Sequence, residues 1–183
     1  MSDASVPSGA KLWVLGARPR TLGVGVTPVI VGTAAAEHAP ALRTIGCLLV
    51  ALGLQVGVNY ANDYSDGKRG VDTASRVGPV RLTASGLKAP RAVAAAAATS
   101  FAVAAAAGVL VARASSWWLL LFGALAILGA VLYSGGPKPY ASAGLGELSV
   151  FLFFGLLATA GTTYVQARHV GPRAWWAAVS VTA

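Results

Sequence analysis

The stretch TIGCLLVALGLQVGVNYANDYSDGKRG, residues 44–70, joins a long apolar run to a short cluster of charges. No charged residue lies between Arg43 and Asp63, and two acids and two bases then follow within seven positions. A helix rising about 1.5 Å per residue needs roughly 20 residues to cross about 30 Å of hydrocarbon. The stretch therefore predicts a membrane-crossing helix, residues 42–66, that is charged at one end.

The rest of the chain repeats the apolar half of this pattern. Of the 183 residues, 56% are hydrophobic and only 11% charged, whereas soluble domains are about 25% charged. Charge-free runs also separate Arg91 from Arg113, Arg113 from Lys138, and Glu147 from Arg168. The sequence predicts an all-α polytopic membrane bundle with an N-terminal tail at residues 1–12. The five complete helices are expected at residues 13–36, 42–66, 90–112, 116–134 and 146–166.

A sixth helix is expected to begin near Arg173. Only 11 residues remain from Arg173 to Ala183, enough for about 16 Å of helix, which is too short to cross a bilayer. The sequence therefore predicts a fragment of a longer chain, cut within a membrane helix.

The basic residues predict the orientation. The net charge of +8 could indicate nucleic-acid binding, but most basic residues lie in short connections between apolar runs. The N-terminal segment, residues 67–91 and the connection near Lys138 hold ten of the fourteen Lys and Arg residues. The positive-inside rule then places the N-terminus and this charged stretch in the cytoplasm. Neither a nucleic-acid partner nor an obligate protein partner is expected.

Small residues predict close packing between the helices. Gly53 and Gly57 form a GxxxG pair, and residues 92–107 are almost entirely Ala with a few other small or apolar residues. Such side chains let membrane helices approach closely. Pro28 is expected to kink the first helix, and Cys47, the single cysteine, is expected to be a buried thiol.

Polar residues form a stripe at the charged end of the predicted second helix. At 100° per residue the stripe occupies a sector about 100° wide; its members are Gln55, Asn59, Asn62, Asp63 and Asp66. A carboxylate near mid-membrane costs about 2.5–3.5 kcal/mol, so such residues normally face a bundle interior or a wet cavity. Carboxylate and amide oxygens with no His or Cys beside them favour Mg²⁺ over zinc.

Basic residues follow the acids at once: Lys68, Arg69, Arg76, Arg81 and Lys88. Acids beside bases suit a metal-bound diphosphate, because carboxylates hold the cation and basic groups bind the remaining phosphate oxygens. An alternative is that Asp63 and Asp66 cap the helix and pair with Lys68 and Arg69 in a solvated loop.

These residues carry a family resemblance. NDYSDGKRGVD (62–72), continued by RVGPVRLTASGL (76–87), resembles the first aspartate-rich motif and following loop of the UbiA superfamily of intramembrane prenyltransferases. The resemblance extends to ARPRTL (17–22), TPVIVGTA (27–34), YSGGPKPYASAGLGELSVFLFFG (133–155) and GTTYVQ (161–166). The chain looks most like the branch that prenylates 1,4-dihydroxy-2-naphthoate, and residues 13–183 would form part of the family's membrane domain.

The resemblance implies a nine-helix bundle with a cytoplasm-facing cavity and two acidic motifs that bind Mg²⁺ and prenyl diphosphate. The implied reaction moves a polyprenyl group from polyprenyl diphosphate to 1,4-dihydroxy-2-naphthoate with decarboxylation, giving demethylmenaquinone. The implied location is a bacterial-type plasma membrane, crossed several times. The second acidic motif, expected on the sixth helix, is absent from the 183 residues, so this fragment alone is expected to be inactive.

Residue roles carry over from the resemblance. The expected metal ligands are Asn62, Asp63, Asp66 and Asp72; the expected catalytic residues are Asp63, Asp66, Lys68 and Arg69; the expected substrate-binding residues are Asn59, Asn62, Arg76, Arg81, Tyr133 and Lys138. The commoner family pattern has an acid where this chain has Gly70, and Asp72 stands two positions later, a shift shared with the naphthoate branch. Tyr133 and Lys138 could instead be an interfacial aromatic and a topogenic lysine.

Three alternatives remain open at this point. Asp63, Asp66 and Gly67 also match the start of the CDP-alcohol phosphotransferase motif, but Gly70-Val71 replaces its next element and no acid follows Asp72 until Glu147. A transporter could use the stripe as an ion path, although no inverted repeat is visible. A third alternative is another branch of the same superfamily, with a different acceptor.

Overall fold

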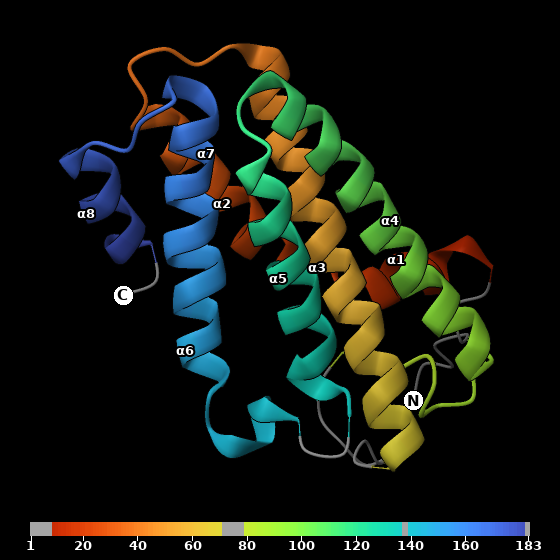
Figure 1. The fold of residues 1–183 in the computed structure, drawn as a ribbon. Helices are drawn as coiled ribbons and strands as arrows, with labels where there is room; N and C mark the ends of the chain where they lie inside the picture. Colours follow the sequence, from red (N-terminus) through yellow and green to blue (C-terminus); the bar gives the residue numbers. More distant parts are fainter. Residues whose placement is uncertain (1–8, 71–78, 137–138, 182–183) are drawn as a thin grey trace, which may run out of the picture.

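The computed structural model describes residues 9–70, 79–136 and 139–181, and within them every regular element is a helix (Figure 1). In chain order the elements are α1 (Ala10–Ala17), η1 (Pro19–Thr21), α2 (Leu22–Ala34), α3 (Ala41–Arg69), α4 (Pro90–Ala114), α5 (Trp118–Ser134), η2 (Tyr140–Ala143), α6 (Gly146–Val150), η3 (Phe151–Ala158), α7 (Thr159–Ala167) and α8 (Pro172–Ser180). The long helices run alternately up and down as a bundle (Figure 1). The prediction of an all-α bundle is confirmed.

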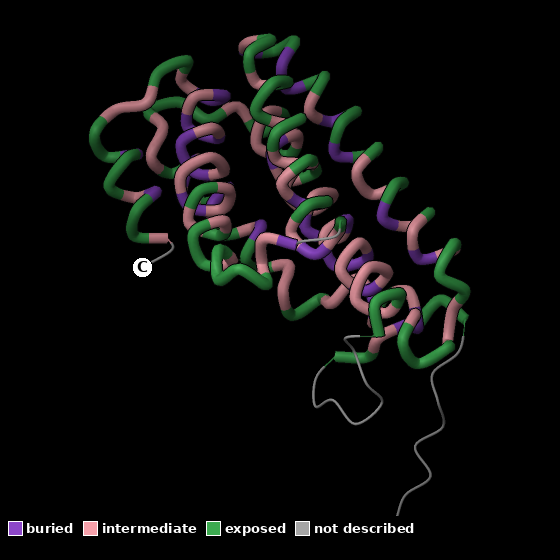
Figure 2. Tube along the Cα trace, turned by 60° about the horizontal axis from the view of Figure 1, so that its bottom comes forward, coloured by how far each residue is buried: buried purple, intermediate pink, exposed green. Residues whose placement is uncertain are grey.

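The surface of the bundle is that of a membrane protein. The helices Ala41–Arg69, Pro90–Ala114 and Gly146–Ala167 are long and apolar enough to cross a bilayer, and α5 is shorter but also apolar. Large apolar side chains point outward, including Leu110 at 65% and Trp118 at 73% exposure. Figure 2 shows buried positions recurring along the long helices α3 and α4, between intermediate and exposed ones. Such an extensive apolar exterior fits lipid rather than water, and the chain is a multi-pass membrane protein.

The predicted first helix, residues 13–36, is wrong as a single element. The helix begins at Ala10 and breaks at Arg18, whose φ of 54° is left-handed, before η1 and α2 continue. Pro19 explains the break, because its ring disfavours helical geometry in the preceding residue and it has no N–H to donate. Pro28, where a kink was expected, lies inside α2, and that helix continues to Ala34.

Helices α3 and α4 form a tightly packed hairpin, as the small residues predicted. A Cβ placed on Gly53 would lie 2.9 Å from the Cβ of Ala104, and one on Gly57 would overlap the Phe101 ring. Only glycine permits this approach. Cys47, on α3, is buried and free, also as predicted.

The predicted fifth helix is one continuous rod, Gly146–Ala167, whose central stretch η3 is π-helical. Its C-terminal part, α7, packs on α2, where a Cβ on Gly32 would overlap the Thr159 carbonyl oxygen. Arg43 Nη1 donates to the carbonyls of Val165 and Gln166, both at 2.9 Å, and so satisfies the end of α7. Helix α5 therefore packs beside α3 and α4, whereas the Gly146–Ala167 rod packs mainly on α2 (Figure 1).

Candidate functional site

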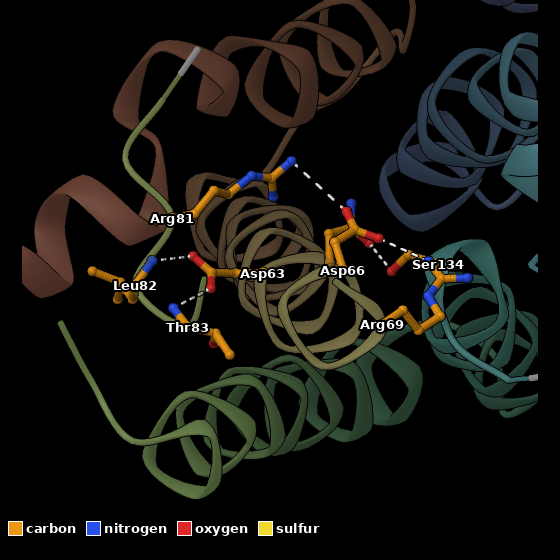
Figure 3. Close-up of polar contacts among 8 residues, drawn as sticks. Asp63, Asp66, Arg69, Arg81, Leu82, Thr83 and Ser134 are labelled. Atoms are coloured by element: carbon orange, nitrogen blue, oxygen red, sulfur yellow. Dashed lines mark hydrogen bonds and ion pairs between the residues drawn. The ribbon is translucent and has the colours of Figure 1, made fainter. Parts of the chain in front are cut away.

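The candidate site lies at the end of the bundle where α3 finishes. Helix α3 reaches Arg69 and is closed by Gly70, whose φ of 66° gives the left-handed cap that glycine favours. Residues 79–88 fold back against this end of α3, and α5 ends beside it at Ser134. Segments far apart in sequence thus surround the polar stripe (Figure 3).

Asp63 is fully buried and bound to backbone. Its Oδ2 accepts from the Leu82 N–H and its Oδ1 from the Thr83 N–H, each at 2.8 Å, and its exposed fraction is 0%. Figure 3 shows the carboxylate pointing at these two residues. Both oxygens of this predicted metal ligand and catalytic residue are therefore engaged by the loop at residues 81–83.

Asp66, one turn further along α3, has side-chain partners. Arg69 Nη2 donates to its Oδ1 at 2.8 Å, and Arg81 Nη2 lies 3.7 Å from its Oδ2. The Asp66 side chain is 18% exposed and that of Arg69 32%. One carboxylate and two guanidinium groups, predicted to share a metal-bound diphosphate, thus meet at one place. The pairing of Asp66 with Arg69 is also what the capping alternative expected.

Lys68, the remaining predicted catalytic residue, is exposed, and its Nζ lies 5.7 Å from the centre of the Tyr64 ring. This is a cation–π distance. Among the described residues, the hydrogen-bond and ion-pair partners of Asp63 and Asp66 do not include Lys68.

Asn62 connects α3 to α5. Its Oδ1 accepts from Ser134 Oγ at 2.6 Å, and the Ser134 side chain is buried. Sequence reasoning missed Ser134 as a site residue, although it lies in the quoted YSGGPKPY segment. The only available signal was a polar residue at the end of an apolar helix, beside Tyr133.

Asn59 and Gln55 face the break between α1 and α2. Asn59 Nδ2 donates to the Ala17 carbonyl at 2.8 Å and to Thr21 Oγ1 at 2.9 Å. Gln55 Nε2 donates to the same hydroxyl at 3.4 Å, and Thr21 Oγ1 donates in turn to the Arg18 carbonyl at 2.9 Å. The predicted substrate-binding residue Asn59 therefore also satisfies the Ala17 carbonyl, a backbone group freed where the helix breaks.

A cavity of about 550 Å³ opens between α2, α3, α4, α5 and the α6–α7 rod. Its wall is mainly apolar. The polar lining residues include Gln55, Asn59, Asn62, Tyr133 and Tyr140. Asp63 and Asp66 are not among the lining residues, so the stripe forms part of the wall only as far as Asn62.

Two tyrosines meet at the polar end of this cavity. The Tyr133 and Tyr140 rings lie edge to face, with centroids 5.5 Å apart, and Tyr140 Oη donates to the Gly129 carbonyl at 2.8 Å. Burial raises the pKa of the Tyr140 hydroxyl above its ordinary value, so the hydroxyl stays protonated and continues to donate. Tyr133 thus has a fixed neighbour and a place on the cavity wall, where substrate contact was predicted.

Three predicted residues, Asp72, Arg76 and Lys138, lie outside the described residues, and their roles stay predictions. Among the described residues, no group of three or more His, Cys, Asp and Glu side chains could hold a metal. The Asp66 carboxylate and the Asn62 amide are nevertheless hard oxygen donors of the type that Mg²⁺ prefers. Mg²⁺ commonly keeps several waters and shares substrate phosphates, so the donor chemistry fits.

The family match and the similar proteins both point to prenyltransferases. Residues 25–183 match the UbiA prenyltransferase family. The 1,4-dihydroxy-2-naphthoate octaprenyltransferase of Mycobacterium tuberculosis is 55% identical over 161 residues, which cover 86% of this chain and 55% of the relative. The Escherichia coli enzyme of the same name is 33% identical over 174 residues, 90% of this chain and 56% of the relative.

A third relative has a different prenyl group in its name. The 2-carboxy-1,4-naphthoquinone phytyltransferase of Synechocystis is 28% identical over 174 residues, covering 92% of this chain and 55% of that protein. The chain thus spans about half the length of each of these relatives.

Proposed function

The chain belongs to the UbiA prenyltransferase family, and on this basis we propose that the whole protein transfers a polyprenyl group from polyprenyl diphosphate to 1,4-dihydroxy-2-naphthoate. Members of the family generally use a divalent metal, and we propose Mg²⁺ here. The observation that carries the proposal is Asp66 between Arg69 and Arg81, one turn beyond Asn62 on the cavity wall. The names of the relatives support the acceptor.

The proposed reaction balances without an oxidant. The bond between the prenyl carbon and the diphosphate oxygen breaks, and that carbon bonds to the ring carbon carrying the carboxylate. The carbon–carboxylate bond then breaks and returns its electron pair to the ring, releasing CO₂. The products are diphosphate, CO₂ and demethylmenaquinone in its quinol form.

The residues at the end of α3 would serve the departing diphosphate. The guanidinium groups of Arg69 and Arg81 place fixed positive charge where negative charge develops, and such electrostatic stabilisation is usually the largest catalytic term. Asn62 and Asp66 would hold the divalent cation, which when bound neutralises diphosphate charge as a Lewis acid.

The cavity would hold the two reacting partners. Its apolar wall suits the prenyl chain and keeps water from an allylic cation. We assign the acceptor ring to the polar end, beside Tyr133, where Asn62 also faces the cavity. Lys138, five positions after Tyr133 in the sequence, is proposed to bind the acceptor carboxylate.

The reaction is tested with the full-length protein in detergent or vesicles. Supplied with 1,4-dihydroxy-2-naphthoate, polyprenyl diphosphate and Mg²⁺, it should form the prenylated quinol, detected by mass spectrometry. EDTA should stop turnover and added Mg²⁺ should restore it. Prenylation of 4-hydroxybenzoate but not of the naphthoate would overturn the acceptor, and full turnover in EDTA would overturn the metal requirement.

We further propose that this end of the bundle faces the cytoplasm of a bacterial plasma membrane. Within these 183 residues Cys47 is the one cysteine, and it is buried, so in a whole protein whose other cysteines have been replaced, introduced cysteines report on their own positions. Ser85, in the loop after α3, and His38, at the opposite end, are both exposed. A membrane-impermeant maleimide added to intact cells should label His38→Cys and not Ser85→Cys. The reverse pattern would invert the orientation.

A further inference from the structure

We propose that Asp63 is a positioning residue whose carboxylate holds residues 81–83 against α3, so that Arg81 stays beside Asp66 to bind the donor diphosphate. This inference rests on the proposed prenyl transfer, and it gives the first acid of the motif a role other than metal binding. Three independent features of the loop carry it.

The first feature is the number and type of Asp63 contacts. Each oxygen accepts a backbone N–H at 2.8 Å, from consecutive residues, Leu82 and Thr83. A carboxylate that accepts two backbone donors at 0% exposure is satisfied by groups fixed to the main chain. Hydrogen bonds to an ionised acceptor are about twice as strong as neutral ones, so the main chain at 82–83 is held firmly.

The second feature is the fit of the loop to the helices. The Leu82 side chain is fully buried in a cluster with Leu12, Tyr60 and Val93. A Cβ on Gly67 would lie 2.6 Å from Thr83 Cγ2, and one on Gly16 would lie 2.6 Å from Leu82 Cδ1. The loop therefore sits in a groove whose depth depends on two glycines.

The third feature is the loop's own bonding. The N–H groups of Ser85, Gly86 and Lys88 donate to the carbonyls of Arg81, Thr83 and Leu82 at 3.1, 3.1 and 3.0 Å respectively. These bonds tie residues 81–88 to one another. Arg81 immediately precedes the two donors to Asp63, and its Nη2 lies 3.7 Å from Asp66 Oδ2 with the side chain only 12% exposed. A shift of the 82–83 main chain must displace this guanidinium.

The kinetic test uses the full-length protein with Mg²⁺, naphthoate and prenyl diphosphate, and compares Asp63→Asn, Asp66→Asn, Arg81→Gln and the Asp63→Asn/Arg81→Gln double variant. Asparagine cannot accept from both backbone donors, so Asp63→Asn should raise KM for prenyl diphosphate by about tenfold or more. The Mg²⁺ concentration for half-maximal rate should stay at the wild-type value. In the Arg81→Gln background, Asp63→Asn should add little, because the group it positions is already gone.

Two kinetic results would overturn the proposal. One is an Asp63→Asn enzyme whose Mg²⁺ dependence shifts as that of Asp66→Asn does, which is the behaviour of a metal ligand. The other is a double variant whose loss equals the two single losses combined, which means that Asp63 does not act through Arg81.

A second test perturbs the loop at residues 81–83 by a substitution that leaves both Asp63 and Asp66 in place. Gly67→Ala places a methyl group against Thr83 and should reproduce the raised KM, while Gly23→Ala, with nothing within 4 Å of its added Cβ, is the matched control. Hydrogen exchange of residues 79–88 should accelerate in Gly67→Ala and in Asp63→Asn but not in the control. Exchange needs no substrate, so it decides the anchoring even if the proposed reaction proves wrong. Unchanged exchange in both variants would sink the inference.

Discussion

Two carboxylates one helical turn apart, Asp63 and Asp66, occupy opposite kinds of environment. Asp63 is completely buried, and within the described part of the chain its donors are two main-chain N–H groups. Asp66 is partly exposed and is met by the guanidinium groups of Arg69 and Arg81. Figure 3 shows the two side chains pointing apart, Asp63 toward Leu82 and Thr83, Asp66 toward Arg69.

The difference indicates that Asp63 holds one fixed set of partners, whereas Asp66 can exchange its partners. A main-chain donor inside a packed loop cannot leave without unfolding that loop, and a buried acceptor without donors costs free energy. Arg69, whose side chain is 32% exposed, can leave one anion for another at little cost, because exposed ion pairs contribute only about 0–1 kcal/mol. Asp63 is thus suited to a permanent contact, whereas Asp66 can change partners when a cation or a diphosphate arrives.

The largest expected effect is on turnover in Asp66→Ala. Loss of the carboxylate that the proposed metal needs should reduce product formation by about a thousandfold or more. The midpoint of thermal unfolding should change little, because the partners of Asp66 among the described residues are the side chains of Arg69 and Arg81, at a partly exposed site. A mass-spectrometric product assay measures the loss of turnover, and thermal unfolding in detergent measures the unfolding midpoint.

Glu37→Gln provides the control for this variant, since Glu37 is an exposed carboxylate between α2 and α3, at the opposite end of the bundle. It should leave both turnover and unfolding unchanged. An Asp66→Ala enzyme with near wild-type turnover would remove Asp66 from the site and end the contrast with Asp63.

The next largest effect is on stability in Asp63→Ala. Two buried N–H groups lose their acceptor, which should lower the free energy of unfolding by about 2–4 kcal/mol. Turnover should fall as well, but less than in Asp66→Ala. Denaturant unfolding in detergent, run beside Asp66→Ala, measures the difference. If Asp66→Ala proves the less stable of the two, the assignment of holding to Asp63 is wrong.

Much of the fold could be predicted from the sequence, since charge-free runs of membrane length mark the helices and glycines mark their contacts. The break at Arg18 was missed although Pro19 signals it, because apolar residues continue on both sides and suggest one span. The π-helical stretch Phe151–Ala158 has no comparable signal: its composition is that of any apolar helix.

The polar stripe was also predictable, but the division of labour within it was not. Asp63 is bound by residues 19 and 20 positions later, and Asn62 by Ser134, 72 positions later. Helical periodicity places side chains on a face but does not say which distant segment covers that face. The two acids therefore look equivalent in sequence.

A smaller effect is expected from Ser134→Ala. Ser134 Oγ donates to Asn62 Oδ1 at 2.6 Å, and its loss should release the Asn62 amide from its fixed position on the cavity wall. Turnover should fall by about three- to tenfold, the value of one hydrogen bond. Ser134→Thr, which keeps the hydroxyl, should recover part of it. Ser142→Ala, at an exposed serine in η2, is the control, and equal rates in the two alanine variants would exclude Ser134 from the site.

The smallest effect is expected from Thr21→Val. This variant tests whether Asn59 serves mainly stability, as Asp63 does, or mainly turnover, as Asp66 does. The substitution keeps the shape but removes the hydroxyl that accepts from Asn59 Nδ2 and donates to the Arg18 carbonyl. If Asn59 acts with Asp63 as a holding residue, unfolding should become easier by about 0.5–1 kcal/mol while turnover per folded molecule is retained. Thr27→Val, at an exposed position of α2, controls for the loss of a hydroxyl. A fall in turnover with unchanged stability would instead place Asn59 with Asp66, because Asn59 also lines the cavity and would then meet the substrate there.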